Sequence, residues 1–397
     1  MLQSVYVTKR TLAGLMLGLL LMYVFGVPAD AAELRGPSIP LTKVLKTPLF
    51  IAQLNGTADD STHGPAVFEA RGIYLSGYAA GDDDRFYELV RLVETTELNA
   101  MVIDVKDASG KTTYLSEVPA VREYGAYSDK IRDLPGRVAE LLKRGIYPIA
   151  RLVVFKDPVL ARERPDLAVQ RPDGTVWVDY NGLAWTNPYA REVWEYNLAI
   201  AREVAAMGFK EIQFDYVRFP SDGPLSLAVY PGRTGLTRSM VIASFLTEAR
   251  RQLAEDGVVI SADIFGLVVS ADDDLGIGQY YEAIQTSVDV VCPMVYPSHY
   301  APHSFGLADP DASPYEVVFR AMQDAVRRSR PGGAIIRPWL QDFSLGHTYG
   351  PAEVRRQIEA AREAGVDQWL LWNPGSRYTK AALREVSVDW ERAPLLR

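Results

Sequence analysis

Short apolar runs alternate with amphipathic segments along most of the chain. Eight of these runs are rich in β-branched and aromatic residues, and they predict strands over 72–78, 98–105, 147–155, 210–216, 258–265, 288–296, 334–340 and 368–372. The runs are apolar throughout rather than alternately polar and apolar. This is typical of strands that are covered on both faces in a parallel sheet.

Between the apolar runs, hydrophobic residues recur at helical spacing. They predict helices over 84–94, 134–144, 190–207, 239–254, 314–328 and 352–364. Glycine stands where four of these helices end, at Gly145, Gly208, Gly257 and Gly365, and glycine there turns a helix toward the next strand. Eight strand-and-helix units over about 320 residues predict a (β/α)8 TIM barrel with enlarged βα loops at 69–397. The alternative is an open doubly wound sheet, whose glycine-rich first turn is missing at 72–77.

The first thirty residues form a separate unit. Lys9 and Arg10 precede an apolar run over 12–27, and an Ala-x-Ala site follows at 29–31. This pattern predicts a secretory signal peptide over 1–31, followed by a proline-containing linker over 32–68. We therefore expect a secreted or cell-envelope protein with no membrane span after cleavage. The alternative is an uncleaved N-terminal anchor, for which the apolar run is short.

Composition narrows the function classes. The net charge of −8 comes without a basic run, which argues against a nucleic-acid partner. No GxxxxGK[ST] phosphate loop occurs, which argues against a nucleotide ligand. The chain has one cysteine and four histidines, and we expect no metal and no other cofactor. The acidic triplets at 82–84 and 272–274 predict helix starts rather than metal sites.

Polar residues gather where the predicted strands end, and in a TIM barrel these ends carry the chemistry. Carboxylates follow the second, fourth, fifth and seventh strands at Asp104, Asp215, Asp263 and Asp342. Hydrolysis of a glycosidic bond needs one carboxyl group as acid and another as nucleophile or base. The acids are flanked by aromatic, basic and histidine side chains that suit contacts with sugars: Lys106, Trp185, Tyr216, Arg218, Tyr296, His299, Trp339 and Trp372.

Structural alternatives exist for several of these residues. They are an ion pair of Asp104 with Lys106, a bond of Asp215 to Arg218, a helix-cap or loop-anchoring role for Asp263, and a plain loop position for Asp342. Trp372 has ordinary barrel core as its alternative. For His299 the alternative is a loop hydrogen bond, and Cys292 is predicted to be core rather than a nucleophile.

The segment Ile-Gln-Phe-Asp-Tyr-Val-Arg-Phe-Pro at 212–220 is the most specific motif in the chain. Together with Trp-Thr-Asn-Pro at 185–188 and Pro-Met-Val-Tyr-Pro at 293–297, it resembles a bacterial family of proposed glycoside hydrolases, once catalogued as a domain of unknown function. That family is distantly similar to the α-amylase clan of TIM barrels, and the resemblance extends from about residue 71 to the C-terminus.

The resemblance implies a glycosidase barrel with Asp215 in the nucleophile position. Carboxylates are also implied after strands five and seven, where this chain has Asp263 and Asp342. Two positions depart from the amylase-like pattern. Asp263 replaces the usual glutamate, and Gln213 stands where the pattern has an arginine two places before the nucleophile.

We therefore expect an exported glycoside hydrolase that acts on an envelope or extracellular polysaccharide. Asp215 is the expected nucleophile and Asp263 the general acid/base, at roughly 5–7 Å from each other on adjacent strands, with retention of configuration. Asp342 is expected to contact the transition state, and Asp104 with the flanking residues to contact the sugar. The alternatives are a carbohydrate-binding barrel without catalysis, in which the acids do not face each other, and a GTP-binding protein.

Overall fold

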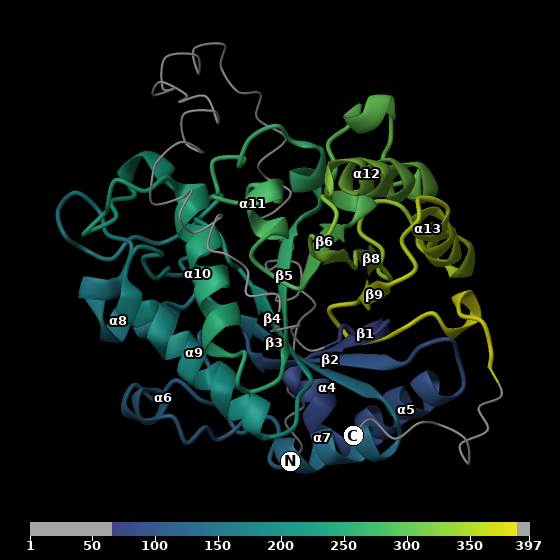
Figure 1. Ribbon diagram of the computed structural model, residues 1–397, viewed down its shortest axis with the longest axis horizontal. Coiled ribbons are helices and arrows are strands. Elements are labelled where there is room, and N and C mark those ends of the chain that lie inside the picture. Colours follow the sequence, from purple (N-terminus) through teal and green to yellow (C-terminus); the bar gives the residue numbers. More distant parts are fainter. Residues whose placement is uncertain (1–65, 387–397) are drawn as a thin grey trace, which may run out of the picture. The chain divides into compact units, whose positions relative to one another are not determined.

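The computed structural model describes residues 66–386 (Figure 1). The predicted signal peptide over 1–31 and most of the predicted linker lie outside the described residues. Within 66–386, none of the helices combines the length and the apolar character needed to cross a bilayer.

Parallel strands form one closed barrel, as predicted. From β1 to β6 each strand pairs with the next, β6 pairs with β7 and β8, β8 pairs with β9, and β9 returns to β1, so the strands close into a ring. The strand segments are β1 (Arg71–Leu75), β2 (Ala100–Lys106), β3 (Tyr147–Val153), β4 (Glu211–Asp215), β5 (Val259–Phe265), β6 (Val290–Val295), β7 (Ile335–Ile336), β8 (Trp339–Gln341) and β9 (Trp369–Trp372).

The seventh strand of the barrel is split into β7 and β8. Both halves pair with β6, and only β8 pairs with β9. Arg337 and Pro338 separate the halves, and the pairing is interrupted because proline has no backbone N–H to donate. The eight predicted strands are thus all present, and one of them is broken at its proline.

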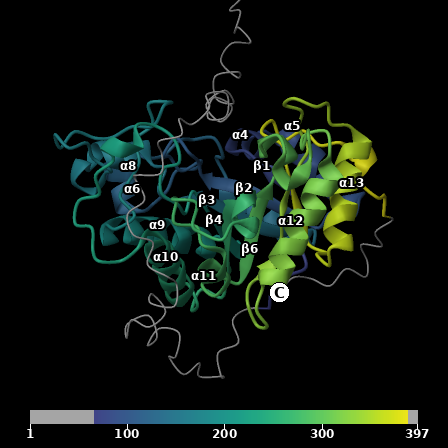
Figure 2. The ribbon, with the colours of Figure 1, turned by 90° about the horizontal axis from the view of Figure 1, so that it is seen from above.

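Helices surround the barrel on its outer side. Figure 2 shows α12 and α13 on one side of the strands and α9 and α10 on the other. The six predicted helices are α5 (Asp83–Glu94), α7 (Leu134–Lys143), α9 (Arg191–Ala206), α10 (Arg238–Gln252), α12 (Pro314–Arg328) and α13 (Pro351–Glu363). The structure adds four short helices that were not predicted, namely α4 (Gly77–Gly81), α6 (Pro119–Glu123), α8 (Pro158–Glu163) and α11 (Tyr281–Gln285).

Local sequence explains most of the helix ends. The four glycines predicted to end helices all have positive φ, from 66° at Gly257 to 104° at Gly208. Asp82 caps α5 by accepting a hydrogen bond from the backbone N–H of Arg85 at 2.8 Å, as expected for the first acidic triplet. The second triplet, 272–274, does not begin a helix. Its members Asp273 and Asp274 accept backbone N–H groups two residues further on and close turns instead.

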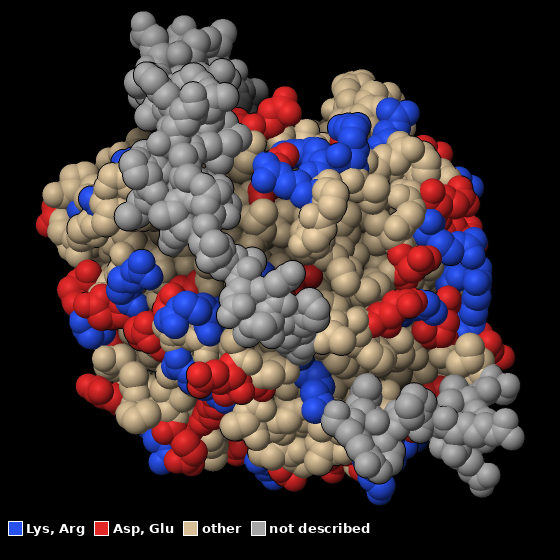
Figure 3. Space-filling model, viewed as in Figure 1, with Lys and Arg blue, Asp and Glu red and all other residues tan. Residues whose placement is uncertain are grey.

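Two apolar layers hold the barrel. The larger lies between the strands and the helices and includes Ile103 and Phe214. The smaller fills the inside of the barrel with residues such as Val102 and Leu370, and it contains Cys292, which is buried as predicted. Alternate residues of a strand point to opposite faces, so Ile103 packs outward while its neighbours on β2 point inward. On the outer surface shown in Figure 3, basic and acidic side chains are interspersed.

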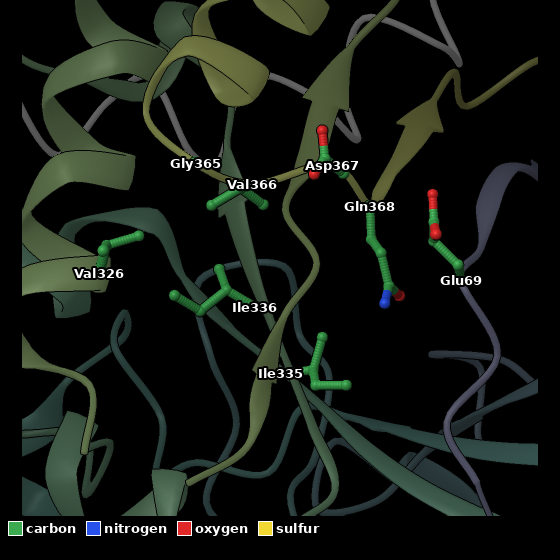
Figure 4. A pocket seen from close by; sticks show the side chains of 8 residues that line it. All are labelled: Glu69, Val326, Ile335, Ile336, Gly365, Val366, Asp367 and Gln368. Atoms are coloured by element: carbon green, nitrogen blue, oxygen red, sulfur yellow. The ribbon is translucent and has the colours of Figure 1, made fainter. Parts of the chain in front are cut away.

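The N-terminal ends of the strands enclose a buried ion pair. Arg337 donates to both carboxylate oxygens of Glu211, at 2.8 and 2.9 Å, and to Gln368 Oε1 at 2.9 Å. Both charged side chains are fully buried. A pocket of about 280 Å³ opens at this end, lined by side chains that include Ile335, Ile336 and Gln368 (Figure 4). Polar contacts at this end of a TIM barrel contribute to stability rather than to chemistry.

Candidate active site

Four charged residues meet at the opposite, C-terminal ends of the strands. Asp104, Arg151, Asp215 and Asp263 belong to β2, β3, β4 and β5, which are neighbours in the barrel. Asp104 and Arg151 are register partners, and Val153, two residues after Arg151, pairs with Asp215. All four side chains are buried. Adjacent strands thus bring together three carboxyl groups and one guanidinium group.

Arg151 contacts all three carboxyl groups. Its Nη1 atom donates to Asp104 Oδ1 at 2.5 Å, and its Nε atom donates to Asp215 Oδ2 at 3.0 Å. The Nη2 atom of Arg151 also donates to Asp215. The same Nε atom lies 3.8 Å from Asp263 Oδ2. One oxygen of Asp215 and one of Asp263 therefore lie no farther apart than the sum of the two Nε distances.

Asp263 differs from Asp215 in its surroundings. One of its oxygens accepts a hydrogen bond from Trp339 Nε1 at 2.7 Å. Burial raises the pKa of Asp263 well above its ordinary value, and the nearby charge of Asp215 raises it further, while Arg151 acts in the opposite direction. Asp215 accepts two of the three hydrogen bonds that Arg151 donates to carboxyl groups. The site thus favours a neutral Asp263 beside a charge-paired Asp215.

Asp104 is anchored on two sides. It accepts a hydrogen bond from Tyr74 Oη at 2.6 Å in addition to the one from Arg151. Burial raises the pKa of Asp104, and the charge of Arg151 partly offsets this effect. These contacts fix the position of Arg151 between Asp104 and Asp215. They make Asp104 a group that orients the arginine.

Lys106 lies outside this cluster. A register shift between Asp104 and Lys106 interrupts the alternation of β2, and the two side chains do not form the ion pair considered from the sequence. Instead Lys106 Nζ is 2.8 Å from Asp157 Oδ2 and donates to the backbone oxygen of Val153 at 2.8 Å. The side chain of Lys106 is fully buried. Its charge is paired and enclosed, which argues against the expected contact with substrate.

Asp342 is also separate from the cluster. Its Oδ1 accepts a hydrogen bond from Thr379 Oγ1 at 2.6 Å, and its Oδ2 accepts one from the Thr379 backbone N–H at 2.9 Å. Within 66–386 it makes no ion pair or hydrogen bond with Arg151, Asp215 or Asp263. The expected contact of Asp342 with the transition state is not what this geometry offers. The residue anchors the loop after β8 to the segment after β9, which is the loop role weighed as its alternative.

The three tryptophans differ in accessibility. Trp185 is 0 % and Trp339 1 % exposed, and their indole N–H groups donate to Asp179 and Asp263. Burial of both indoles argues against the expected stacking of Trp185 and Trp339 on a sugar. Trp372 is only partly buried. Its ring stacks on Tyr74 with ring centroids 4.0 Å apart, and the guanidinium carbon of Arg151 lies 5.1 Å from its centre.

Tyr296 and His299 lie beside the cluster at the end of β6. The Tyr296 ring packs edge-on against His299 at 5.4 Å and against Phe343 at 5.8 Å. Burial raises the pKa of Tyr296, and the charges of Asp263 and Asp215 raise it further, so its hydroxyl group stays neutral. His299 is exposed and shares a hydrogen bond with Ser298 Oγ at 3.0 Å, which matches its alternative loop role.

Tyr216 and Arg218 follow β4 directly. Tyr216 has a φ of 51°, which is unusual for a residue with a side chain, and its N–H donates to Asp215 Oδ1 at 2.5 Å. Arg218 is buried and packs on the rings of Trp185, Tyr216 and Phe265. Asp215 and Arg218 do not form the pair weighed from the sequence, because Arg151 occupies the carboxylate.

Arg151 and Tyr74 were not recognised from the sequence. The signal for Arg151 was indirect, in that Gln213 stands where the amylase-like pattern has an arginine. Gln213 is the register partner of Arg151, so the guanidinium reaches Asp215 from the neighbouring strand at the same level of the barrel. Gln213 itself points to Cys292, with Nε2 and Sγ 3.3 Å apart.

A closed (β/α)8 barrel with paired carboxyl groups at its C-terminal end is an architecture of glycoside hydrolases. A model of the family described as "Putative glycosyl hydrolase domain" matches residues 72–378, and the chain belongs to this family. The resemblance seen in the sequence is thereby confirmed. A search of curated proteins found no match.

Solved structures include similar chains. A hypothetical protein from Ruminiclostridium thermocellum is 40 % identical over 52 % of this chain and 98 % of its own, with a TM-score of 0.45. The PgaB (BpsB) glycoside hydrolase domain from Bordetella bronchiseptica is 15 % identical over 77 % of this chain and 94 % of its own, with a TM-score of 0.57. An α-L-fucosidase from Paenibacillus thiaminolyticus is 15 % identical over 79 % of this chain and 48 % of its own, with a TM-score of 0.50. The last two show the fold.

Proposed function

We propose that this protein is a retaining glycoside hydrolase, with Asp215 as nucleophile and Asp263 as general acid/base. The observation that carries the proposal is the unequal pair of carboxyl groups beside Arg151. Asp215 is bound by the guanidinium group, whereas burial and the Asp215 charge raise the pKa of Asp263. A glycosidase needs this inequality, because one carboxyl group must be charged while the other carries a proton.

The first step breaks the glycosidic bond. The Asp215 carboxylate forms a bond to the anomeric carbon, the bond from that carbon to the leaving oxygen breaks, and the Asp263 proton passes to this oxygen. The ester that results has no charge on Asp215. Since that charge raises the pKa of Asp263, its loss lowers the pKa, and Asp263 becomes a suitable base. It then takes a proton from water, whose oxygen bonds to the anomeric carbon and releases Asp215.

The charge balance of the cluster suits the transition state. When Asp263 carries its proton, the carboxyl groups of Asp104 and Asp215 face the single guanidinium group of Arg151. The glycosyl transition state carries positive charge on the ring, and negative charge on Asp104 and Asp215 in excess of the guanidinium charge stabilises it. Asp104 and Tyr74 keep Arg151 in place, and the partly exposed side chain of Trp372 lies next to Arg151, where it contributes apolar surface to a bound sugar ring.

The spacing of the two carboxyl groups is compatible with retention. The shared Nε atom of Arg151 places one oxygen of Asp215 and one oxygen of Asp263 no farther apart than the sum of 3.0 and 3.8 Å. This upper limit for one pair of oxygens includes the separation of about 5–5.5 Å that is typical of retaining enzymes.

The substrate proposed is a polysaccharide of the cell envelope or outside the cell. This rests on the N-terminal export pattern at 1–31. N-terminal sequencing of the mature protein from the producing cell tests the export step. A start near Ala32 is expected, and a start at Met1 would contradict cleavage.

Incubation of the purified protein with a polysaccharide panel tests the function. New reducing ends are expected with at least one polysaccharide, and proton NMR of the first product should show the anomeric configuration of the substrate. Binding without new reducing ends would instead support the carbohydrate-binding alternative. An inverted first product would exclude Asp215 as nucleophile.

A further inference from the structure

Arg218 is a buried cation without an ionic partner in the part of the chain that the structure describes. The residue is 7 % exposed, and its Nη1 atom donates to the backbone oxygen of Phe219 at 3.0 Å and to Ser221 Oγ at 3.1 Å. Within 66–386, no carboxylate oxygen lies within 4.0 Å of its guanidinium group. Burial of a charge is costly unless it is paired, so this arginine needs an explanation.

The unused part of the guanidinium is its side-on fork, formed by Nε and Nη2. Neither atom makes a hydrogen bond to another described residue. Elsewhere in this chain the same fork binds a carboxylate with both nitrogens, in the pairs Arg164–Asp166, Arg251–Glu248 and Arg328–Glu282. This two-bond geometry is the one that arginine prefers with carboxylates.

Neighbouring charges do not supply the missing partner. Asp179 accepts hydrogen bonds from Trp185 and from the backbone N–H groups of residues 181 and 183, and it lies 3.2 Å from Lys156 Nζ. Its carboxylate is therefore occupied, and so is the charge of Lys156. Asp222 acts on Arg218 only from beyond ion-pair distance. Arg218 is therefore the cation of this group that has no carboxylate oxygen within ion-pair distance among the described residues.

The position of Arg218 connects it with the candidate active site. It lies three residues after Asp215, and its guanidinium carbon is 4.6 Å from the centre of the Phe265 ring, two residues after Asp263. The rings of Trp185 and Tyr216, at 4.9 and 5.1 Å, enclose it further. The arginine thus stands between the ends of the two strands that carry the proposed catalytic acids.

We propose that the Nε and Nη2 atoms of Arg218 bind the carboxylate of an acidic sugar, so that the substrate is a polysaccharide containing uronic acid. The inference rests on the proposed function, whose substrate class it narrows. A single unpaired positive charge with two parallel donors matches a planar carboxylate with one negative charge. The enclosing aromatic rings exclude water and strengthen this ion pair.

A matched pair of substrates tests the proposal. The panel consists of uronic-acid polysaccharides (polygalacturonate, alginate, hyaluronan and heparosan) and of the same polymers after chemical reduction of their carboxyl groups to alcohols. Oligosaccharides from both sets are titrated against the Asp215→Asn protein, so that binding is measured without turnover. At least one acidic oligosaccharide should bind about tenfold or more tightly than its reduced counterpart.

Variants connect this preference with the arginine. In the Asp215→Asn background, Arg218→Gln and Arg218→Met should bring the affinity ratio of acidic to reduced ligand close to one, and the methionine preserves packing against the rings. Arg251→Gln removes the same charge from an exposed site and should keep the ratio. Thermal melts establish that each variant is folded.

The outcomes separate the two proposals. Equal binding of acidic and reduced ligands, or no binding of any acidic one, overturns the carboxylate site even if neutral polysaccharides are hydrolysed. A preference that survives in a folded Arg218 variant overturns the role of Arg218. Preferential binding that depends on Arg218, combined with no hydrolysis by the wild-type protein, supports the site and refutes the enzymatic function.

Discussion

The two ends of the barrel each bury an arginine, and the arginines have different partners. Arg337 at the N-terminal end bonds both oxygens of one carboxylate, that of Glu211. Arg151 at the C-terminal end faces three carboxyl groups. The charges of the first pair balance each other, and both side chains are fully buried, so neither can act on a substrate. The second group has surplus acid and keeps one carboxyl group prone to hold a proton, which is the condition for acid–base work.

The largest effect is expected when the C-terminal cluster loses its nucleophile. Asp215→Asn should lower kcat by about three orders of magnitude or more, because the amide cannot form the glycosyl ester. The two side chains are nearly isosteric, and folding should be retained. Release of reducing ends measures the activity, and circular dichroism with a thermal melt measures folding. Full activity of a folded Asp215→Asn protein would contradict the mechanism.

Breaking the N-terminal pair should change stability and spare activity. Glu211→Gln leaves the Arg337 charge buried without its counter-ion, which costs about 3–5 kcal/mol of the free energy of unfolding. Urea denaturation measures this loss. The specific activity per folded molecule should stay within about twofold of wild type, since this end is remote from the carboxyl cluster. An unchanged free energy of unfolding would show that the ion pair between Glu211 and Arg337 does not stabilise the N-terminal end of the barrel.

Asp263→Asn should change how stability depends on pH. The pKa of Asp263 is raised in the folded protein from its ordinary value of 3.8. Between these two values the folded state binds more protons than the unfolded state, so rising pH lowers the free energy of unfolding of the wild type. The Asp263→Asn variant has no titrating group at this position, so its free energy of unfolding does not fall for this reason. Its stability relative to wild type should therefore increase as the pH rises through that interval, measured by urea denaturation in a pH series.

A falling or constant difference across the same series would contradict the raised pKa. Asp104, whose pKa is also raised, is present in both proteins, so the comparison at each pH isolates Asp263.

The smallest effect is expected at Asp342, the acid that the structure separates from the cluster. Asp342→Asn should lower the free energy of unfolding by about 1 kcal/mol, through one weakened contact with Thr379. Its kcat should remain within about twofold of wild type, and this makes it a matched control for Asp215→Asn. A loss of activity as large as that of Asp215→Asn would place Asp342 in the mechanism after all.

Most of the fold was predictable because its signals are local. Continuous apolar runs predicted the buried strands, and glycines predicted helix ends that have positive φ in the structure. The break between β7 and β8 also has a local cause, Pro338. The effect of this proline on the sheet, however, depends on how the strand pairs with β6. The short helices α4, α6, α8 and α11 have too few residues to show a helical period.

The candidate site was predictable only in part. Asp215 and Asp263 stood out as acids within apolar strands, a position that local sequence reveals. Arg151 did not, because its role follows from register with β2 and β4, which the sequence of one strand does not contain. The burial of Trp185 and Trp339 was not predictable for a similar reason. Whether an indole face is covered depends on distant loops that pack against it.

Identification of the glycosylated residue tests the account most directly. The wild-type protein is mixed with a 2-deoxy-2-fluoro glycosyl fluoride of the sugar identified with the panel, and the denatured protein is digested and sequenced by mass spectrometry. The account predicts one glycosyl ester, on Asp215. An ester on Asp104, Asp263 or Asp342, or no ester together with an inverted product of the natural substrate, would contradict it.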